Sequence, residues 1–93
     1  NDVLIIQEGI CHYWLKDYDK SINCFQKIKI PGYALFYLAA GHMKNKDSER
    51  AIEKLKEAKA ITGQSVDEFV NSLSYTKDDM VEDLLNTLNS TSV

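Results

Sequence analysis

The sequence predicts an all-α fold, and three observations support this prediction. Only four glycines and one proline occur in the 93 residues, which suits helices better than a turn-rich sheet. Apolar residues recur at steps of three and four, the spacing of one helix face. Finally, the segment KDYDKSINCF at 16–25 returns as KDSERAIEKL at 46–55. A repeat of this length is typical of stacked helical hairpins.

The first predicted unit spans residues 2–30 and consists of two helices joined by a tight turn. Asp17 stands where the second helix should begin, and its carboxylate can accept hydrogen bonds from the unpaired amides of the first turn. We therefore interpret it as a helix cap and not as a catalytic acid. The apolar faces of the two helices are made of Leu4, Ile5, Ile6, Ile10, Tyr13 and Trp14, then Tyr18, Ile22, Phe25 and Ile28.

The second predicted unit spans residues 31–61 and repeats this pattern, with Asp47 as the corresponding cap. Pro31 is expected in the first turn of its first helix, where proline is well tolerated. The apolar positions of this unit are Leu35, Phe36, Ala39, Ala40 and Met43, then Ala51, Ile52, Leu55 and Ala58.

Small residues recur twelve positions apart in each unit, which places one on each helix of the hairpin. Small side chains at both points let two backbones approach closely, and a large apolar residue four positions further on fills the space beyond them. These structural repeat positions are Gly9, Ser21 and Phe25 in the first unit and Ala39, Ala51 and Leu55 in the second.

The repeat ends after Ala60, and residues 65–88 are expected to form a C-terminal cap. Gly63 can end the fourth helix in the left-handed conformation. Ser65 and Glu68 have the spacing of a capping box, which predicts a short helix that ends near Leu73.

A last amphipathic helix is predicted after Thr76, with one face formed by Met80, Val81, Leu84, Leu85 and Leu88. Such a face must pack on something. We expect it to cover the apolar end of the second unit, as terminal elements of solenoids do; the alternative is that it docks a partner.

The two units resemble tetratricopeptide repeats (TPR), whose unit is a helix-turn-helix of about 34 residues. The resemblance rests on the small residues, the segments that follow Asp17 and Asp47, and the large apolar residues at Phe25 and Leu55. The spacing of 30 is shorter than the family's unit, so an abbreviated link is expected between the repeats. The resemblance implies one TPR-like domain over residues 1–93, an α-solenoid fragment of two repeats plus capping helices, expected to be part of a longer cytoplasmic, bacterial protein.

For such repeats, the resemblance implies recognition on a concave face lined by the first helix of each unit. The main hypothesis is therefore a non-catalytic protein-protein interaction or oligomerisation module. Trp14 and Tyr37 are the best anchor candidates, because large amphipathic rings bind well near a groove; burial in the interhelical core is the competing interpretation for each residue. The expected partner-binding residues are Ile6, Ile10, Tyr13, Trp14, Tyr33, Phe36, Tyr37 and Met43.

The partner is expected to be a protein or peptide, a preceding domain of the same chain, or a second copy in a homodimer. Two other functions stay open. The order of the segments at 31–33, 74–79 and 83–88 is similar to the C-terminal repeat tail of some bacterial class III adenylate or guanylate cyclases, which implies a regulatory tail. A small apolar ligand-binding domain would instead hold its ligand near Trp14.

Catalytic, cofactor and metal sites are not expected in this segment. No triad, P-loop or zinc-finger spacing is present, and the repetition of His12 as His42 indicates structural equivalents. Cys11 and Cys24 are interpreted as small buried hydrophobes. The net charge of -3, with both signs interleaved, disfavours a nucleic-acid partner, and no apolar run is long enough to predict a membrane span.

Overall fold

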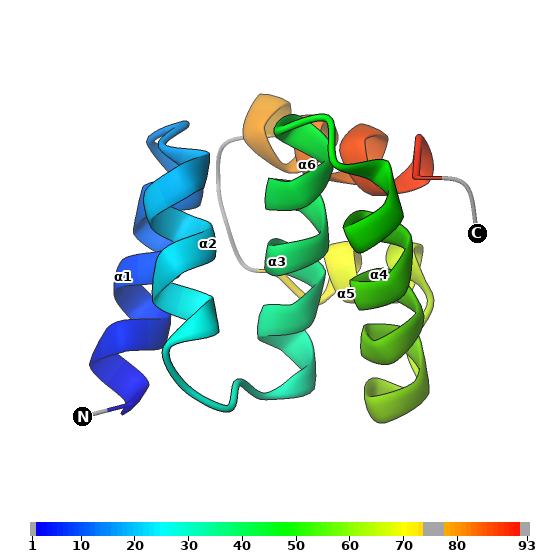
Figure 1. The fold of residues 1–93 in the computed structure, drawn as a ribbon. Coiled ribbons are helices and arrows are strands. Elements are labelled where there is room, and N and C mark those ends of the chain that lie inside the picture. Colours follow the sequence, from blue (N-terminus) through cyan, green and yellow to red (C-terminus); the bar gives the residue numbers. More distant parts are fainter. Residues whose placement is uncertain (1, 74–77, 92–93) are drawn as a thin grey trace.

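The computed structural model describes residues 2–73 and 78–91, and within these ranges the chain is helical without any strand. The prediction of an all-α fold is confirmed. The six helices described are α1 (Asp2–Trp14), α2 (Tyr18–Gln26), α3 (Gly32–Lys44), α4 (Ser48–Thr62), α5 (Val66–Asn71) and α6 (Asp78–Asn89). Helices α1 to α4 stand side by side with alternating direction, so that both hairpin turns lie at the same end, and α6 crosses at that end (Figure 1).

The turn between α1 and α2 is a Schellman motif. Lys16 has a positive φ of 66°, its amide donates to the Tyr13 carbonyl at 3.0 Å, and the Asp17 amide donates to the His12 carbonyl at 2.9 Å. The Asp17 carboxylate then accepts a hydrogen bond from the Lys20 amide at 3.4 Å. One short turn therefore satisfies the last carbonyls of α1 and the first amides of α2, and Asp17 is confirmed as a cap.

The turn between α3 and α4 has the same geometry. Lys46 has a φ of 64°, its amide donates to the Met43 carbonyl at 3.0 Å, and the Asp47 amide donates to the His42 carbonyl at 2.9 Å. Asp47 accepts from the Arg50 amide at 3.3 Å. The sequence repeat thus corresponds to a repeated backbone conformation, in which each histidine supplies the carbonyl that closes the turn.

The two helices of the first hairpin touch at Gly9 and Ser21. The Ser21 hydroxyl donates to the Gly9 carbonyl at 2.7 Å, and a Cβ atom on Gly9 would lie only 2.6 Å from the Phe25 ring. The corresponding residues of the second hairpin, Ala39 and Ala51, are fully buried on helices that pack against each other. Both hairpins therefore place small residues where their helices meet.

Helix α3 is the centre of the molecule and packs against α1, α2, α4 and α6 (Figure 1). Pro31 is the residue that immediately precedes it, and except for Tyr33 every residue from Gly32 to His42 is buried. Gly32 lets α3 start close to the end of α4, because a Cβ atom there would lie 2.5 Å from Thr62 Cγ2.

The end of α4 and the start of α5 follow the predicted signals. Gly63 takes the left-handed conformation with a φ of 68°. The Ser65 hydroxyl accepts from the Glu68 amide at 3.2 Å, and the Ser65 amide donates to the Glu68 carboxylate at 3.0 Å, so the capping box is confirmed. Helix α5 ends at Asn71, somewhat before the predicted end. The predicted helix start at Thr76 lies outside the described residues.

Helices α5 and α6 also contribute residues to the core around α3. The Phe69 ring of α5 stacks on the Phe36 ring of α3, with centroids 4.2 Å apart and an interplanar angle of 13°. Leu84 and Leu88 of α6 are fully buried, and Leu85 packs partly against the same core. Leu84, Leu85 and Leu88 of the apolar face predicted for the last helix therefore pack inside this chain, whereas Met80 is half-buried.

Candidate functional site

The residues expected to line a concave binding face do not form one open surface. Tyr33 is 46% exposed, while Phe36 and Tyr37 are buried beneath the Phe69 ring of α5, which stacks on the first and meets the second edge to face at 5.6 Å. Of the others, Ile6 and Tyr13 are buried and Ile10, Trp14 and Met43 are half-buried. The aromatic face of α3 is therefore largely occupied by the chain's own C-terminal helices.

Four aromatic rings gather where α1, α2 and α3 meet. The Tyr13 ring lies at their centre, with its centroid 5.3 Å from Trp14, 5.5 Å from Tyr18 and 5.7 Å from Tyr37, all edge to face. Trp14 and Tyr37 are 5.9 Å apart. Edge-to-face pairs of this kind each contribute about 0.5–1.5 kcal/mol beyond area burial, so these rings are held in fixed positions.

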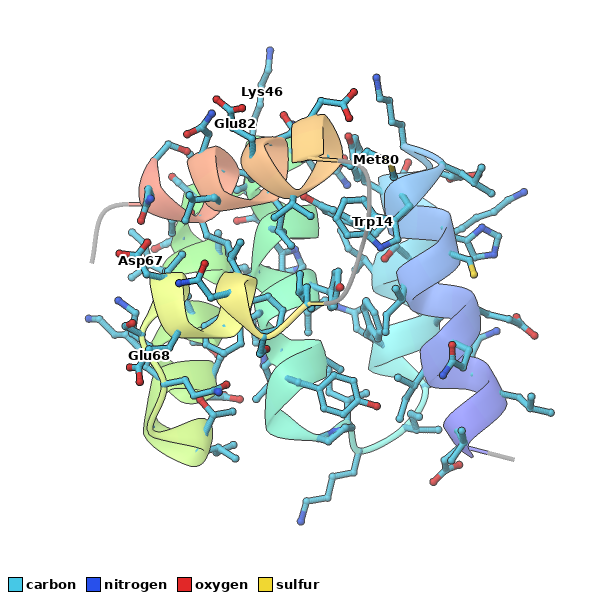
Figure 2. All side chains as sticks on the ribbon, turned by 180° about the vertical axis from the view of Figure 1, so that it is seen from behind. Trp14, Lys46, Asp67, Glu68, Met80 and Glu82 are labelled. Carbon is cyan, nitrogen blue, oxygen red and sulfur yellow. The ribbon has the colours of Figure 1, made fainter. Side chains whose placement is uncertain are left out.

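A hollow of about 280 Å³ opens beside this cluster, between the turn end of the first hairpin and α6. We call it the aromatic hollow. Trp14 of α1 and Met80 of α6, both half-buried, are labelled in Figure 2 and line it together. The full lining consists of Tyr13, Trp14, Lys16, Tyr18, Lys44, Asp79, Met80 and Asp83.

Charges of both signs surround the aromatic hollow. The Lys44 ammonium of α3 pairs with the Asp83 carboxylate of α6 at 3.0 Å, which links the centre of the fold to the helix that closes the hollow. Lys16 and Asp79, both exposed, also line it. The walls therefore combine aromatic surface with groups that can bind charged or polar atoms.

The Tyr13 side chain lines the hollow, but its hydroxyl is buried and makes no hydrogen bond of good geometry with the described residues. Burial, together with the nearby Asp83 carboxylate, raises the pKa of Tyr13 above its ordinary value, and the neighbouring Thr87 side chain offsets this only in part. The hydroxyl therefore stays protonated and can donate a hydrogen bond.

A second group of polar side chains lies on the first hairpin. Glu8 and His12 of α1 and Cys24 of α2 bring one carboxylate oxygen, one ring nitrogen and the sulfur within 4.8 Å of one another. Cys24 is 6% exposed, whereas Cys11 is exposed. The expectation that both cysteines are buried is wrong for Cys11, because it lies on the solvent side of α1.

The sequence indicates Tyr13 and Trp14 as binding residues, but it does not indicate the residues on the other side of the hollow. Lys44, Asp79, Met80 and Asp83 come from α3 and α6, and their approach to Trp14 depends on how α6 crosses the hairpins. The i, i+4 spacing of Glu8 and His12, which places them on one helix face, was a signal available in the sequence.

The fold and these two groups of residues define a small all-helical domain with an aromatic hollow. The chain matches no protein-family model, and no curated protein or solved structure is significantly similar to it. None of the helices in the described ranges is long and apolar enough to cross a membrane.

Proposed function

We propose that this chain is a TPR-like, non-catalytic interaction module that binds a peptide segment of a partner protein in the aromatic hollow. The observation that carries the proposal is the hollow itself, whose lining brings together Trp14, Tyr13, Tyr18 and Met80. Aromatic rings and methionine at a partly open pocket are the side chains that dominate binding energy at protein interfaces.

The hollow has room for one large apolar side chain of a peptide. Its volume of about 280 Å³ is close to the lower end of the range for small-molecule pockets, about 300–1,000 Å³. The Tyr13 and Trp14 rings in the lining provide the aromatic surface that such a side chain would contact.

The charges around the hollow bear on the flanking residues of the peptide. Lys16 and Asp79 lie in its lining and suit a segment whose apolar anchor is flanked by an acidic and a basic residue. Such groups contribute mainly to orientation and association rate, so the affinity depends on the anchor.

The test is a selection of binding peptides from a randomised displayed library, followed by titration of a synthetic peptide. Trp14 is the single tryptophan of the chain, so its fluorescence reports occupancy of the hollow directly. Met80→Ala should weaken the selected peptide by about tenfold, or about 1.4 kcal/mol. Met43→Ala is the matched control, because Met43 is also half-buried but lies outside the hollow lining.

Two outcomes contradict the proposal: selection that yields no binding peptide, and binding that Met43→Ala weakens while Met80→Ala does not. The second outcome would favour the surface of α3 that the TPR resemblance implied.

A second candidate function is binding of a small apolar ligand, which the position of Trp14 in the lining supports. It predicts a saturable change in Trp14 fluorescence with a small-molecule set and none with the selected peptides. The regulatory-tail and homodimer hypotheses stay predictions, and no contact of the described residues distinguishes them from the interaction module.

A further inference from the structure

We propose that Glu8, His12 and Cys24 form a binding site for a divalent metal ion such as zinc. The three side chains offer one oxygen, one nitrogen and one sulfur atom, all within 4.8 Å of one another. Magnesium and calcium prefer oxygen ligands alone, whereas a set of thiolate, imidazole and carboxylate suits zinc. Among the described residues this is the one group of three or more potential ligands close enough together.

The backbone of the first hairpin holds the three residues in place. Ser21 and Gly9 are joined by the hydrogen bond of 2.7 Å between α2 and α1. Cys24 lies one helical turn beyond Ser21, and Glu8 and His12 flank Gly9 along α1. The ligands therefore come from two helices that a buried hydrogen bond joins nearby, and not from a loop.

The distances fit a tetrahedral site after a small adjustment of side chains. Bonds of about 2.0–2.3 Å to the metal place neighbouring ligand atoms about 3.5 Å apart. Without a metal, the three ligand atoms lie within 4.8 Å of one another. Glu8 is exposed and can rotate inward. Binding converts the Cys24 thiol to a thiolate and releases its proton to solvent, and a water molecule completes the four ligands.

The second hairpin provides an internal comparison. The positions that correspond to Glu8, His12 and Cys24 through the 30-residue shift are 38, 42 and 54, occupied by leucine, histidine and lysine. The histidine therefore belongs to the repeat, but the acid and the thiol occur in the first hairpin alone. The site is an addition to one hairpin and goes beyond the proposed peptide binding.

The test uses Co²⁺ as a spectroscopic probe and Zn²⁺ in competition with a chromophoric chelator. The parent chain should show sulfur-to-cobalt charge-transfer absorption and a single tight zinc site. Cys24→Ser should abolish this absorption. It should also lower zinc affinity by more than about 100-fold, because loss of a group that only supports a metal ligand already costs about 10–100-fold. Cys11→Ser is the matched control and should change neither, because Cys11 is exposed and not part of the group.

Glu8→Gln keeps the test valid if loss of the buried thiol disturbs folding. Glu8 is on the surface, so its variant should keep the parent's circular dichroism while zinc affinity falls at least tenfold. The proposal is overturned if the parent shows no charge-transfer absorption with Co²⁺, if that absorption survives in Cys24→Ser, or if a folded Glu8→Gln variant binds zinc like the parent.

Discussion

The hydroxyl of Ser21 donates a hydrogen bond of 2.7 Å to the carbonyl of Gly9, and both residues are buried. This contact joins α1 and α2 directly, and the Phe25 ring packs against Gly9. A buried hydroxyl that found no acceptor would cost about 1–3 kcal/mol. The contact therefore fixes the register of the first hairpin, on which both the aromatic hollow and the proposed metal site are built.

Gly9→Ala should destabilise the protein. The added methyl would lie 2.6 Å from Phe25, whose ring is almost fully buried and cannot move aside. Overpacking of this kind costs about 1–3 kcal/mol, and the better helix propensity of alanine returns about 1 kcal/mol. We expect a net loss of up to about 2 kcal/mol in the free energy of unfolding, measured by urea denaturation.

Gly41→Ala is the control for this prediction. Its methyl would meet Cγ1 of the half-buried Ile22 at 3.3 Å and Cδ1 at 3.7 Å, so the gain in helix propensity should balance the small adjustment. Equal losses for Gly9→Ala and Gly41→Ala would contradict the close approach of α1 to Phe25.

Lys16→Gly and Lys46→Gly should each stabilise the protein. Both lysines have positive φ values, 66° and 64°, a conformation that costs a non-glycine residue about 1–2 kcal/mol. Glycine removes this cost but adds about 0.5–1 kcal/mol of unfolded-state entropy. The expected gain is about 0.5–1 kcal/mol at each turn, measured by thermal unfolding. Since the two turns share one geometry, a gain at one and a loss at the other would contradict their equivalence.

His42 should make stability depend on pH. Burial lowers its pKa below 6.5; the nearby Asp47 and Glu53 oppose this shift, whereas Arg50 and Lys54 act with it. The unfolded chain therefore binds a proton at a higher pH than the folded chain. The stability that the neutral side chain contributes is complete above pH 6.5 and declines as the pH falls from 6.5 to the folded-state pKa.

Urea denaturation at several pH values checks this prediction. His42→Gln, which cannot titrate, should lose the part of the decline that begins just below pH 6.5. The matched variant His12→Gln should retain it. An unchanged slope in His42→Gln would show that another group causes the decline.

Phe69→Ala should uncover the aromatic face of α3. The Phe69 ring is buried on Phe36 and Tyr37, and removal of a buried phenylalanine side chain costs about 3–5 kcal/mol. The control Phe69→Leu keeps most of the apolar volume and should lose only about 1–3 kcal/mol, for the two aromatic contacts with Phe36 and Tyr37. If Phe69→Ala lowers the free energy of unfolding by less than about 1 kcal/mol, the packing of α5 on α3 is contradicted, because this value is well below the range expected for the truncation.

The parts of the fold that depend on local sequence were predictable. Asp17, Asp47 and the capping box at Ser65 act within one helical turn, so their spacing alone identifies them. The 30-residue repeat predicted equivalent turns for the same reason, although nothing in the residue type indicated the left-handed conformation of Lys16.

The parts that depend on packing between distant segments were not predictable in the same way. The pairing of Lys44 with Asp83 and the position of Met80 beside Trp14 follow from the direction in which α6 crosses the hairpins. An apolar face in the sequence indicates that a helix packs on something, but not where. This is why the aromatic residues expected on an open face are divided between a covered core and the hollow.

Chemical-shift mapping of the labelled protein during titration with a library-selected peptide tests most directly whether the aromatic hollow binds a peptide. We predict that the largest shifts fall on the residues of the aromatic hollow, with Trp14, Tyr18 and Met80 among them, and that Met80→Ala reduces these shifts at equal peptide concentration. Shifts concentrated on another surface, such as the exposed Val3 and Leu4 of α1, would contradict binding in the hollow.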